Sequence, residues 1–248
     1  MRPVMFVLLA AATLAAQQDQ QPSKVDPGGP GKAPSDAEVL FDGTDLTKWR
    51  SGDGGPAGCQ VEEGDMVCRT GSGNVFSGDE FGSAQMHVEF NVPFMPSEKD
   101  QGRGNSGFYI QGRYEIQILD SYDNPTYPTG QAGALYDDHA PLVNASRPPG
   151  EWQSYDIIFH AFQCDPQGNI LRPGTLTVFH NGVLIHDNVP IRKVHGACIQ
   201  RGPIMLQDHA FPGAPITVMR FRNIWVRPID DGGASTIRGR TGIGRGGR

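Results

Sequence analysis

The sequence predicts an all-β protein built as a two-sheet antiparallel sandwich or jelly roll. Short apolar segments alternate with turn residues, and no long stretch repeats with the 3.6-residue period of a helix. The chain also contains 33 Gly and 20 Pro, which favour many turns. Strands with one apolar face must cover it with a second sheet, so many antiparallel strands in one domain favour two packed layers.

Length and charge limit the number of domains and the class of partner. The 248 residues, 38% of them hydrophobic, suffice for one domain with a sizeable core. The net charge is −6, so nucleic acid is not an expected partner of the folded part. We expect no transmembrane segment, and the sequence does not indicate an oligomeric state.

Residues 1–16 predict a secretory signal peptide. Arg2 precedes an apolar run, and the small residues Thr13 and Ala15 suit a cleavage site. The run is too short to span the roughly 30 Å of hydrocarbon in a bilayer. A lipoprotein needs a Cys at the cleavage point, whereas the first Cys is Cys59. We therefore expect a secreted or periplasmic protein that is not a lipoprotein.

Composition divides the remainder into three segments. Residues 17–36 are rich in Gln, Pro and Gly and predict a disordered linker. Residues 37–229 form the predicted domain. Residues 230–248 predict a disordered tail, interpreted as solvated or in contact with acidic cell-surface polymers; an intracellular tail of this type would suit RNA. Its arginines are Arg238, Arg240, Arg245 and Arg248.

The strand candidates are apolar or alternating segments bounded by turn residues. Asn181 and Gly182 predict a type I′ hairpin turn, the strongest local signal of this kind. No solenoid or propeller repeat is visible. The candidates are residues 85–92, 106–112, 114–119, 154–162, 175–187, 204–209 and 216–229.

Four cysteines in an exported protein predict two disulfides, for which three pairings exist. A two-residue turn at Glu63 and Gly64 would place Cys59 directly opposite Cys68, whereas a three-residue turn would place them on opposite faces. We predict a Cys59–Cys68 bridge. Cys164–Cys198 follows by remainder. The absence of CxxC spacing argues against a zinc or thiol-redox site.

Residues 104–122, GNSGFYIQGRYEIQILDSY, predict a hairpin whose loop length decides which side chains share a face. A two-residue turn would mix apolar and charged side chains on both faces. A three-residue loop at 111–113 pairs Phe108 with Ile116 and produces one coherent apolar face. We therefore predict the three-residue loop.

The opposite face of this hairpin carries Tyr109 beside Glu115 and Gly107 beside Gln117. Polar residues on the outer face of a strand are ordinarily its solvated side. An aromatic ring, a carboxylate, an amide and a Gly that leaves room for a ligand also fit a binding cleft. The hairpin alone leaves both readings open.

Asp120 lies five residues after Glu115, so plain alternation does not place both on one face. A bulge at 118–119 would do so, and bulges are frequent beside active sites. The order Glu115, Gln117, Asp120 resembles the catalytic strand of laminarinase-like and lichenase-like glucanases of the concanavalin A-like superfamily. Gln117 cannot serve as an acid, and Asp120 is one methylene shorter than Glu, so the retaining pair of carboxylates is not implied.

A closer resemblance covers residues 40–229. Six blocks in order, LFDGTDLTKW, GNSGFYIQGRYEIQILDSY, GALYDDHAPLVNASRPPGEWQSYDIIFHA, VFHNGVLIHDNV, GPIMLQDH and FRNIWVRPI, resemble the 3-keto-disaccharide hydrolase domain family, formerly a domain of unknown function. The resemblance implies a jelly roll of the concanavalin A-like lectin/glucanase type. It also implies a keto-disaccharide or other oligosaccharide substrate.

A glycoside oxidised at carbon 3 has an acidic proton at carbon 2, so its cleavage needs a base, a group that stabilises the enolate and a proton donor. Glu115 is the first candidate for the base, because partial burial mid-sheet would raise its pKa. Asp120 is the second candidate, as partner or acid. His209 and Asp208 are candidates for polarising the ketone. Alternation in residues 204–209 places Gln207 and His209 where they could reach the cleft, while Asp208 points to a strand end.

Other polar residues of the matching blocks are candidates for contacting the substrate, with Arg220 and Arg222 fitting either a sugar-binding face or a solvated edge. His139 with Asp138, or either arginine, could also polarise the ketone. The predicted catalytic set is Glu115, Asp120 and His209. The predicted substrate-binding set is Asn105, Tyr109, Gln117, Tyr136, Asp138, His139, Gln207, Asp208, Arg220 and Arg222.

The remaining histidines and the tryptophans are interpreted as structural. This applies to His160, His180, His186 and His195, and to Trp49, Trp152 and Trp225 as core residues. No cofactor is assigned. A divalent metal such as calcium stays open, with His209, Asp208, His139 or Glu115 as ligands, because no diagnostic metal motif is present.

The sequence therefore predicts an exported enzyme that cleaves 3-keto-disaccharides or 3-keto-glycosides by base-initiated elimination or hydrolysis on a concave sheet. The main alternative is a non-catalytic, lectin-like carbohydrate-binding module, because this fold houses both. A third, an ordinary β-glucanase, is disfavoured by Gln117.

Overall fold

The structure is a computed structural model that describes residues 21–29, 32–210, 213 and 216–229. The chain divides into two compact units, Met1–Asp36 and Ala37–Arg248. In the first unit, the amide of Ser35 donates to the carbonyl oxygen of Asp26 at 2.9 Å. The predicted signal peptide and the predicted tail lie outside the described residues.

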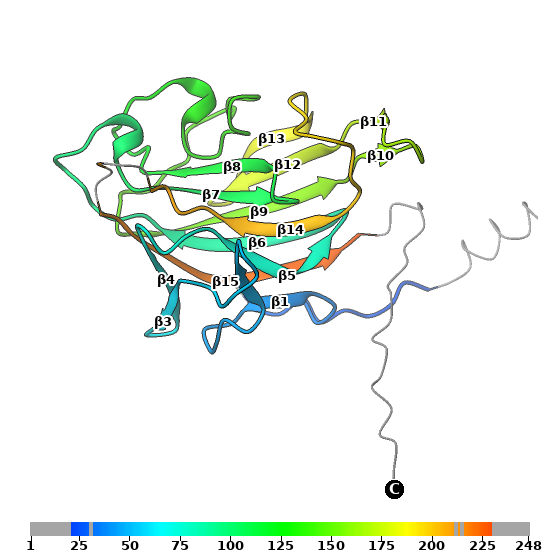
Figure 1. Cartoon of the computed structure of the whole chain (residues 1–248), viewed down its shortest axis with the longest axis horizontal. Coiled ribbons are helices and arrows are strands. Elements are labelled where there is room, and N and C mark those ends of the chain that lie inside the picture. The colour runs from blue at the N-terminus through cyan, green and yellow to red at the C-terminus, as the bar shows by residue number, and fades with distance from the viewer. Residues whose placement is uncertain (1–20, 30–31, 211–212, 214–215, 230–248) are drawn as a thin grey trace, which may run out of the picture. The chain divides into compact units, whose positions relative to one another are not determined.

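In the described part of the second unit, two large antiparallel sheets are stacked in layers, and a two-stranded sheet accompanies them (Figure 1). The described residues of the larger, eight-stranded sheet follow the order β13 (Val183–Pro190), β12 (Thr175–His180), β9 (Trp152–His160), β6 (Ala84–Asn91), β15 (Val218–Pro228), β4 (Asp65–Arg69), β3 (Gln60–Glu62), with β1 (Glu38–Phe41) pairing with β15.

The smaller sheet has five strands within the described residues and carries the hairpin singled out above. Its order is β2 (Trp49–Ser51), β5 (Val75–Phe81), β14 (Gly202–Leu206), β7 (Asn105–Ile110), β8 (Tyr114–Leu119). Three short elements complete the fold: the β10 (Gln163–Cys164) and β11 (Ile170–Arg172) pair, and the 3₁₀ turns η1 (Asp100–Gly102) and η2 (Pro128–Gly130). This arrangement confirms the predicted jelly-roll sandwich.

Alternating side chains of both sheets fill the space between them. Along β9, residues Tyr155, Ile157 and Phe159 are buried, and Leu176 and Val178 of the adjacent β12 are buried likewise. This period of two is the reason why these segments fold as half-buried strands. No helix of the described residues has the length and apolar character needed to cross a bilayer.

The predicted turns and disulfides are present. Glu63 and Gly64 have φ of 55° and 84°, as a two-residue hairpin turn requires, and Cys59 bonds to Cys68. Asn181 and Gly182 have φ of 52° and 80° and connect His180 to Val183. Cys164 bonds to Cys198.

The tryptophan prediction is confirmed at two of three positions. Trp49 and Trp225 are buried, and Trp49 donates its indole N–H to the carbonyl oxygen of Leu40 at 3.0 Å. Trp152 is only half-buried, so its prediction as a core residue is wrong. It begins β9 on the outward parity, where its ring contacts the guanidinium of Arg222 at 3.9 Å.

Candidate active site

The β7–β8 hairpin has the predicted three-residue loop. Its register pairs Tyr109 with Glu115 and Gly107 with Gln117, while Phe108 and Ile116 pair on the core side. Gln111 and Gly112 adopt φ of 55° and 62°, which allows the short loop. Loop length and parity therefore place Tyr109, Glu115 and Gln117 on the outer face of the smaller sheet.

The predicted bulge at residues 118–119 is wrong. The register with β7 stays continuous up to the pair of Asn105 and Leu119, so Asp120 does not join the Glu115 face. The strand ends at Leu119, and the Asp120 carboxylate instead accepts bonds from the Arg103 guanidinium and the Tyr122 amide, both at 3.2 Å. Burial raises the pKa of Asp120, although Arg103 opposes this shift. The Asp120 amide still donates to the carbonyl oxygen of Gly104 at 2.8 Å, so plain alternation without a bulge places Asp120 on the parity of Ile116 and Ile118. Its carboxylate thus anchors a loop.

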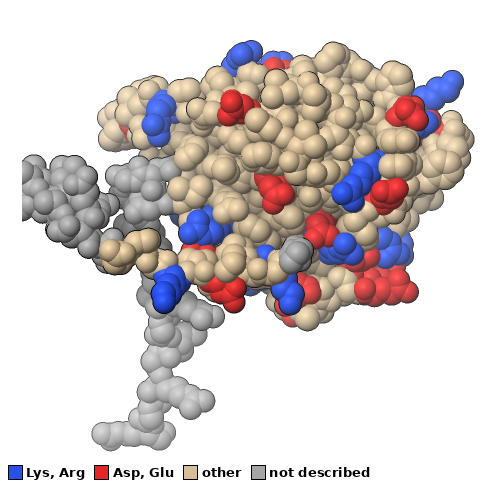
Figure 2. All heavy atoms as spheres, turned by 180° about the vertical axis from the view of Figure 1, so that it is seen from behind, with Lys and Arg blue, Asp and Glu red and all other residues tan. Residues whose placement is uncertain are grey.

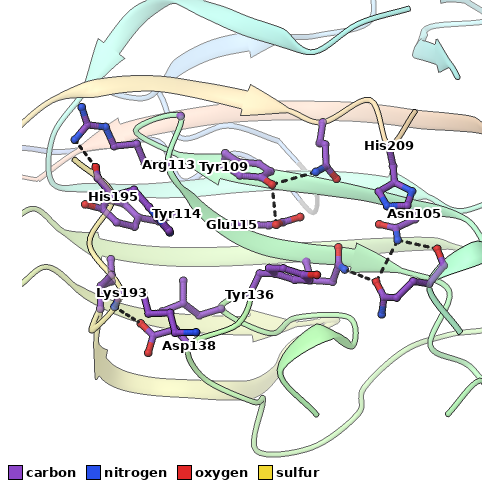
Figure 3. A pocket seen from close by; sticks show the side chains of 16 residues that line it. Asn105, Tyr109, Arg113, Tyr114, Glu115, Tyr136, Asp138, Lys193, His195 and His209 are labelled. Carbon is purple, nitrogen blue, oxygen red and sulfur yellow. Dashed lines mark hydrogen bonds between the residues drawn. The ribbon is translucent and has the colours of Figure 1, made fainter. Parts of the chain in front are cut away.

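A pocket of about 440 Å³ lies over this face (Figure 3). The hairpin forms its floor, and three segments distant in sequence form its walls. The lining residues are Gln101, Asn105, Tyr109, Gly112, Arg113, Tyr114, Glu115, Gln117, Leu135, Tyr136, Asp138, Ile191, Lys193, His195, Gln207 and His209.

Glu115 lies in this pocket and is 8% exposed. Its Oε2 accepts the hydroxyl of Tyr109 at 2.7 Å, and the amide of Gln207 donates to the same tyrosine oxygen at 3.1 Å. Burial raises the pKa of Glu115 to about 7, although the Tyr109 hydrogen bond opposes that rise. Burial and the charge of Glu115 raise the pKa of Tyr109. A carboxylate poised near neutral pH suits a general base.

Gly107 makes this arrangement sterically feasible. A Cβ at this position would overlap the Oε1 of Glu115 and the ring of Tyr109. A side chain at this position would displace Glu115 or Tyr109, so Gly107 lets both keep their positions on this face of the hairpin.

Carboxamide side chains surround the carboxylate. Gln117 donates from Nε2 to Gln101 Oε1 at 3.1 Å and to the carbonyl oxygen of Gly130 at 3.2 Å, and Asn105 donates to the carbonyl oxygen of Gln101 at 2.9 Å. The oxygens Asn105 Oδ1, Gln117 Oε1 and Gln207 Oε1 are buried and accept no hydrogen bond within the described part of the chain. Buried acceptors need donors. A ligand with several hydroxyl groups would supply them.

A segment from the long β8–β9 connection covers the free edge of β8. The backbone amide of Gln117 donates to the carbonyl oxygen of Ala134 at 2.9 Å. The backbone amide of Tyr136 donates to the carbonyl oxygen of Glu115 at 3.0 Å. Tyr155, buried in β9, donates its hydroxyl to the carbonyl oxygen of Gln117 at 2.7 Å. The backbone that carries Glu115 is therefore held on both sides.

The side chains of residues 207–209, which follow β14, point in alternating directions, as predicted. Gln207 and His209 line the pocket, and the hydroxyl of Ser106 donates to the carbonyl oxygen of Gln207 at 2.7 Å. Asp208 points away and accepts the amides of Gly71 and Gly73 at 2.9 and 2.8 Å. Burial lowers the pKa of His209, which favours a neutral imidazole.

Cationic residues that the sequence analysis did not select line one end of the pocket. Arg113 donates from Nη1 to the carbonyl oxygen of His195 at 2.9 Å (Figure 3) and to that of Ala197 at 2.7 Å. Lys193 pairs with Asp137 at 2.5 Å. Arg113 is the last residue of the three-residue hairpin loop, which is a local signal of its position. Lys193 and His195 enter from a segment whose position depends on long-range packing. The prediction of His195 as merely structural therefore overlooked its place in the pocket.

Several predicted residues bond to other parts of the protein, and all of these except Asp138 lie outside the pocket. Asp138 lines the pocket, but its Oδ2 accepts a hydrogen bond from the backbone amide of Arg192 at 2.7 Å. The ring of His139 bonds to the carbonyl oxygen of Pro190 at 2.8 Å. The prediction of a sugar-binding role for Arg220 and Arg222 is not supported by their position. Both lie on the outward parity of β15, in the other sheet.

These two arginines pair within the outer face of the larger sheet. Arg220 bonds to Asp65 at 3.2 Å, and Arg222 bonds to Glu89 at 2.6 Å. The buried histidines agree better with expectation, since His180 bonds to Gln153 at 2.9 Å and His186 to the carbonyl oxygen of Gly133 at 2.7 Å. Both are structural, as predicted.

The predicted metal ligands do not form a cluster. No group of three or more His, Cys, Asp or Glu side chains within the described ranges is arranged to hold a metal ion. Asp208 and His139 are engaged with backbone groups, as described above, and only Glu115 and His209 of the predicted ligands line the pocket.

Comparison with known proteins identifies the family. The 3-keto-alpha-glucoside-1,2-lyase-like domain matches residues 36–227. A Parabacteroides distasonis ATCC 8503 protein, provisionally assigned as a glycosyl hydrolase, is similar with 41% identity and a TM-score of 0.77 over 85% of this chain and 93% of that one.

Two further Parabacteroides distasonis ATCC 8503 proteins with the same provisional assignment share the fold. They are 19% and 18% identical, with TM-scores of 0.59 and 0.55, and cover 84% and 78% of this chain and 100% and 99% of their own. No curated protein matches. The chain belongs to the 3-keto-alpha-glucoside-1,2-lyase-like domain family, a carbohydrate-active family with a concanavalin A-like jelly-roll fold.

Proposed function

We propose that this protein is an exported enzyme that cleaves 3-keto-glycosides, including 3-keto-disaccharides, with Glu115 as the general base. The observation that carries the proposal is the buried Glu115 carboxyl, whose pKa of about 7 and hydrogen bond to Tyr109 suit proton abstraction in the pocket. Family membership and the 41% identical relative support carbohydrate chemistry in general.

The reaction follows from the acidity of the substrate. The Glu115 carboxylate takes the proton from carbon 2, and the electron pair of that C–H bond forms an enolate with the ketone at carbon 3. When the enolate collapses, a double bond forms between carbons 1 and 2 and the bond from carbon 1 to the glycosidic oxygen breaks. The ketone re-forms, and the departing alkoxide takes the proton that Glu115 gained and leaves as an alcohol, which returns Glu115 to its ionised form. Addition of water to the unsaturated ketone then gives net hydrolysis.

The residues around Glu115 suit this route better than glucanase chemistry. A retaining glycosidase uses two carboxyl groups about 5 Å apart. Here Gln117 stands beside Glu115 on the same face, and Asp120 has turned into the Arg103 pair. A substrate that supplies its own acidic proton does not need the second carboxyl group.

The buried carboxamides and His209 support a sugar ring in this position. The oxygens of Asn105, Gln117 and Gln207, which accept no hydrogen bond from the residues that the structure describes, would accept bonds from ring hydroxyl groups. His209, which lines the pocket and has a lowered pKa, would donate an N–H to the ketone oxygen as negative charge develops there.

The lectin-like alternative is less well supported. A module that only binds sugar would have no reason to bury a carboxyl group, because burial penalises the charged form unless it is compensated. Glu115 is 8% exposed with a raised pKa. The two disulfides agree with export to an oxidising compartment.

Release of the aglycone from a 3-keto-glucoside tests the proposal. Wild-type protein should release it, and Glu115→Gln should be at least about 100-fold slower, since a positioned base contributes about 10²-fold to 10⁴-fold. Glu151→Gln, an exposed site outside the pocket, is the matched control and should behave as wild type. Equal rates for wild type and Glu115→Gln would remove Glu115 from the mechanism. No release by wild type, with binding of the same glycoside, would favour the lectin-like module.

A further inference from the structure

Two exposed tyrosines stand together at the edge of the pocket. Tyr136 lines it and is 39% exposed, and Tyr127 beside it is 42% exposed. Their hydroxyl groups share a hydrogen bond of 2.6 Å, and their rings meet edge to face with centroids 6.3 Å apart. We call these two residues the tyrosine pair. Two large rings left in water at a pocket mouth are available to a ligand.

The tyrosine pair is held rigidly to the strand that carries the base. The amide of Tyr136 donates to the carbonyl oxygen of Glu115 at 3.0 Å. The Tyr127 turn is held through the carbonyl oxygen of Gly130, which accepts the side-chain amides of Gln117 and Gln101 at 3.2 and 2.9 Å. A Cβ at Gly130 would overlap the ring of Tyr127, so this glycine lets the ring lie flat against the turn.

Such a preorganised arrangement is typical of a binding surface. Ordering a long or aromatic side chain on binding consumes part of the interaction free energy, and rings that are already fixed avoid this loss. Figure 3 shows Tyr136 close to Glu115 on the opposite side of the carboxyl group from Tyr109. If a sugar ring is bound over Glu115 for proton abstraction, the tyrosine pair therefore lies between that ring and the solvent.

We propose that the tyrosine pair forms a second subsite, which packs against the apolar face of the leaving-group sugar. The inference rests on the proposed function, because it places the oxidised ring over Glu115 and the carboxamides. The glycosidic bond then points toward the mouth, where a second ring meets Tyr127 and Tyr136. The substrate class is thus a keto-disaccharide or longer keto-oligosaccharide, in preference to a keto-glycoside with a small alkyl aglycone.

The test compares two substrates, a 3-keto-disaccharide and the methyl glycoside of the same 3-keto sugar. Tyr136→Ala and Tyr127→Ala should each lower kcat/KM for the disaccharide by roughly threefold to tenfold, the range expected for one aromatic contact. The methyl glycoside should change by less than about twofold. Tyr136→Phe and Tyr127→Phe keep the rings, so they should retain the preference for the disaccharide.

Tyr122→Ala is the matched control, because this tyrosine is 41% exposed and does not line the pocket. It should leave both substrates unchanged. An equal loss on both substrates in the alanine variants, or no loss on the disaccharide, would overturn the second subsite. If wild type turned over neither substrate, the proposed function would fail, and calorimetric binding of the same two glycosides would still decide whether the tyrosine pair discriminates between them.

Discussion

Glu115 shows how the surroundings of one residue set its chemistry. Burial moves the pKa of its carboxyl from 4.5 to about 7, and the Tyr109 hydroxyl, by donating to the charged form, opposes that shift. A carboxyl with a raised pKa in the folded state contributes stability below the unfolded pKa and loses it as pH rises through the folded value. Glu115 should therefore stabilise the fold most below pH 4.5 and least above pH 7.

The pH dependence of kcat/KM on a 3-keto-glycoside follows from this pKa. The rate should rise with pH and level off above about 7, because the ionised carboxyl is the base. Tyr109→Phe removes the donor that favours the charged form, so the midpoint should move upward by about one pH unit. Tyr122→Phe should leave the midpoint unchanged. A profile with the same midpoint in Tyr109→Phe would show that this hydrogen bond does not tune Glu115.

At the scale of elements, the pocket depends on a tethered segment as much as on the hairpin. The hairpin supplies Tyr109, Glu115 and Gln117 through its three-residue loop. The segment 191–198 supplies the opposite wall. Arg113 holds it through two carbonyl oxygens, and the Cys164–Cys198 disulfide ties its end to β10.

Removal of this disulfide should affect both stability and substrate binding. The Cys164→Ser, Cys198→Ser double variant opens a bridge with a sequence separation of 34, and we expect it to lower the free energy of unfolding by about 3 kcal/mol. The KM for the keto-glycoside should rise because Lys193 and His195 lose their fixed position. Chemical denaturation and steady-state kinetics measure the two effects.

The second disulfide provides the matched control for that variant. Cys59 and Cys68 have a sequence separation of only 9, and their bridge ties the residue directly before β3 to the neighbouring strand β4 of the larger sheet. Their replacement by Ser should lower stability by a smaller amount and leave KM unchanged. An equal KM in all three proteins would mean that the 191–198 wall holds its position without the tether.

At the scale of the second unit as a whole, the outer faces of the two large sheets differ in the side chains that they carry. One carries the pocket over β7 and β8. The other, over the larger sheet, carries compensated ion pairs such as Arg222 with Glu89. Figure 2, which views the molecule from behind, shows acidic and basic side chains interspersed there, without one dominant sign.

Arg222→Ala should therefore leave catalysis unchanged. Its guanidinium contacts Trp152 and Glu89 on the face away from the pocket, so the expected loss of stability is about 1 kcal/mol or less. kcat/KM should stay within about twofold of wild type. Arg113→Ala, which removes a cation that lines the pocket, is the contrasting variant and should raise KM. A large kinetic loss in Arg222→Ala would contradict this assignment of faces.

Much of the site was predictable from local rules. Parity along residues 104–122 and the length of one loop placed Glu115 beside Tyr109, and the turn at Glu63 and Gly64 predicted the Cys59–Cys68 bridge. These features depend on residues close in sequence, where turn chemistry and the period of two are sufficient.

The tertiary structure decided what local rules leave undetermined. Asp120 faces away from Glu115 because the β7–β8 register continues without a bulge, and the presence or absence of a bulge cannot be read from a pattern of polar residues. The outward residues of β15 obey the same alternation whichever sheet contains them, so sequence could not tell that Arg222 faces away from the pocket. The walls formed by Lys193 and His195, and the tyrosine pair, depend on which distant segments pack together. That choice rests on burial and backbone hydrogen bonds summed over the whole domain, and one segment by itself does not contain it.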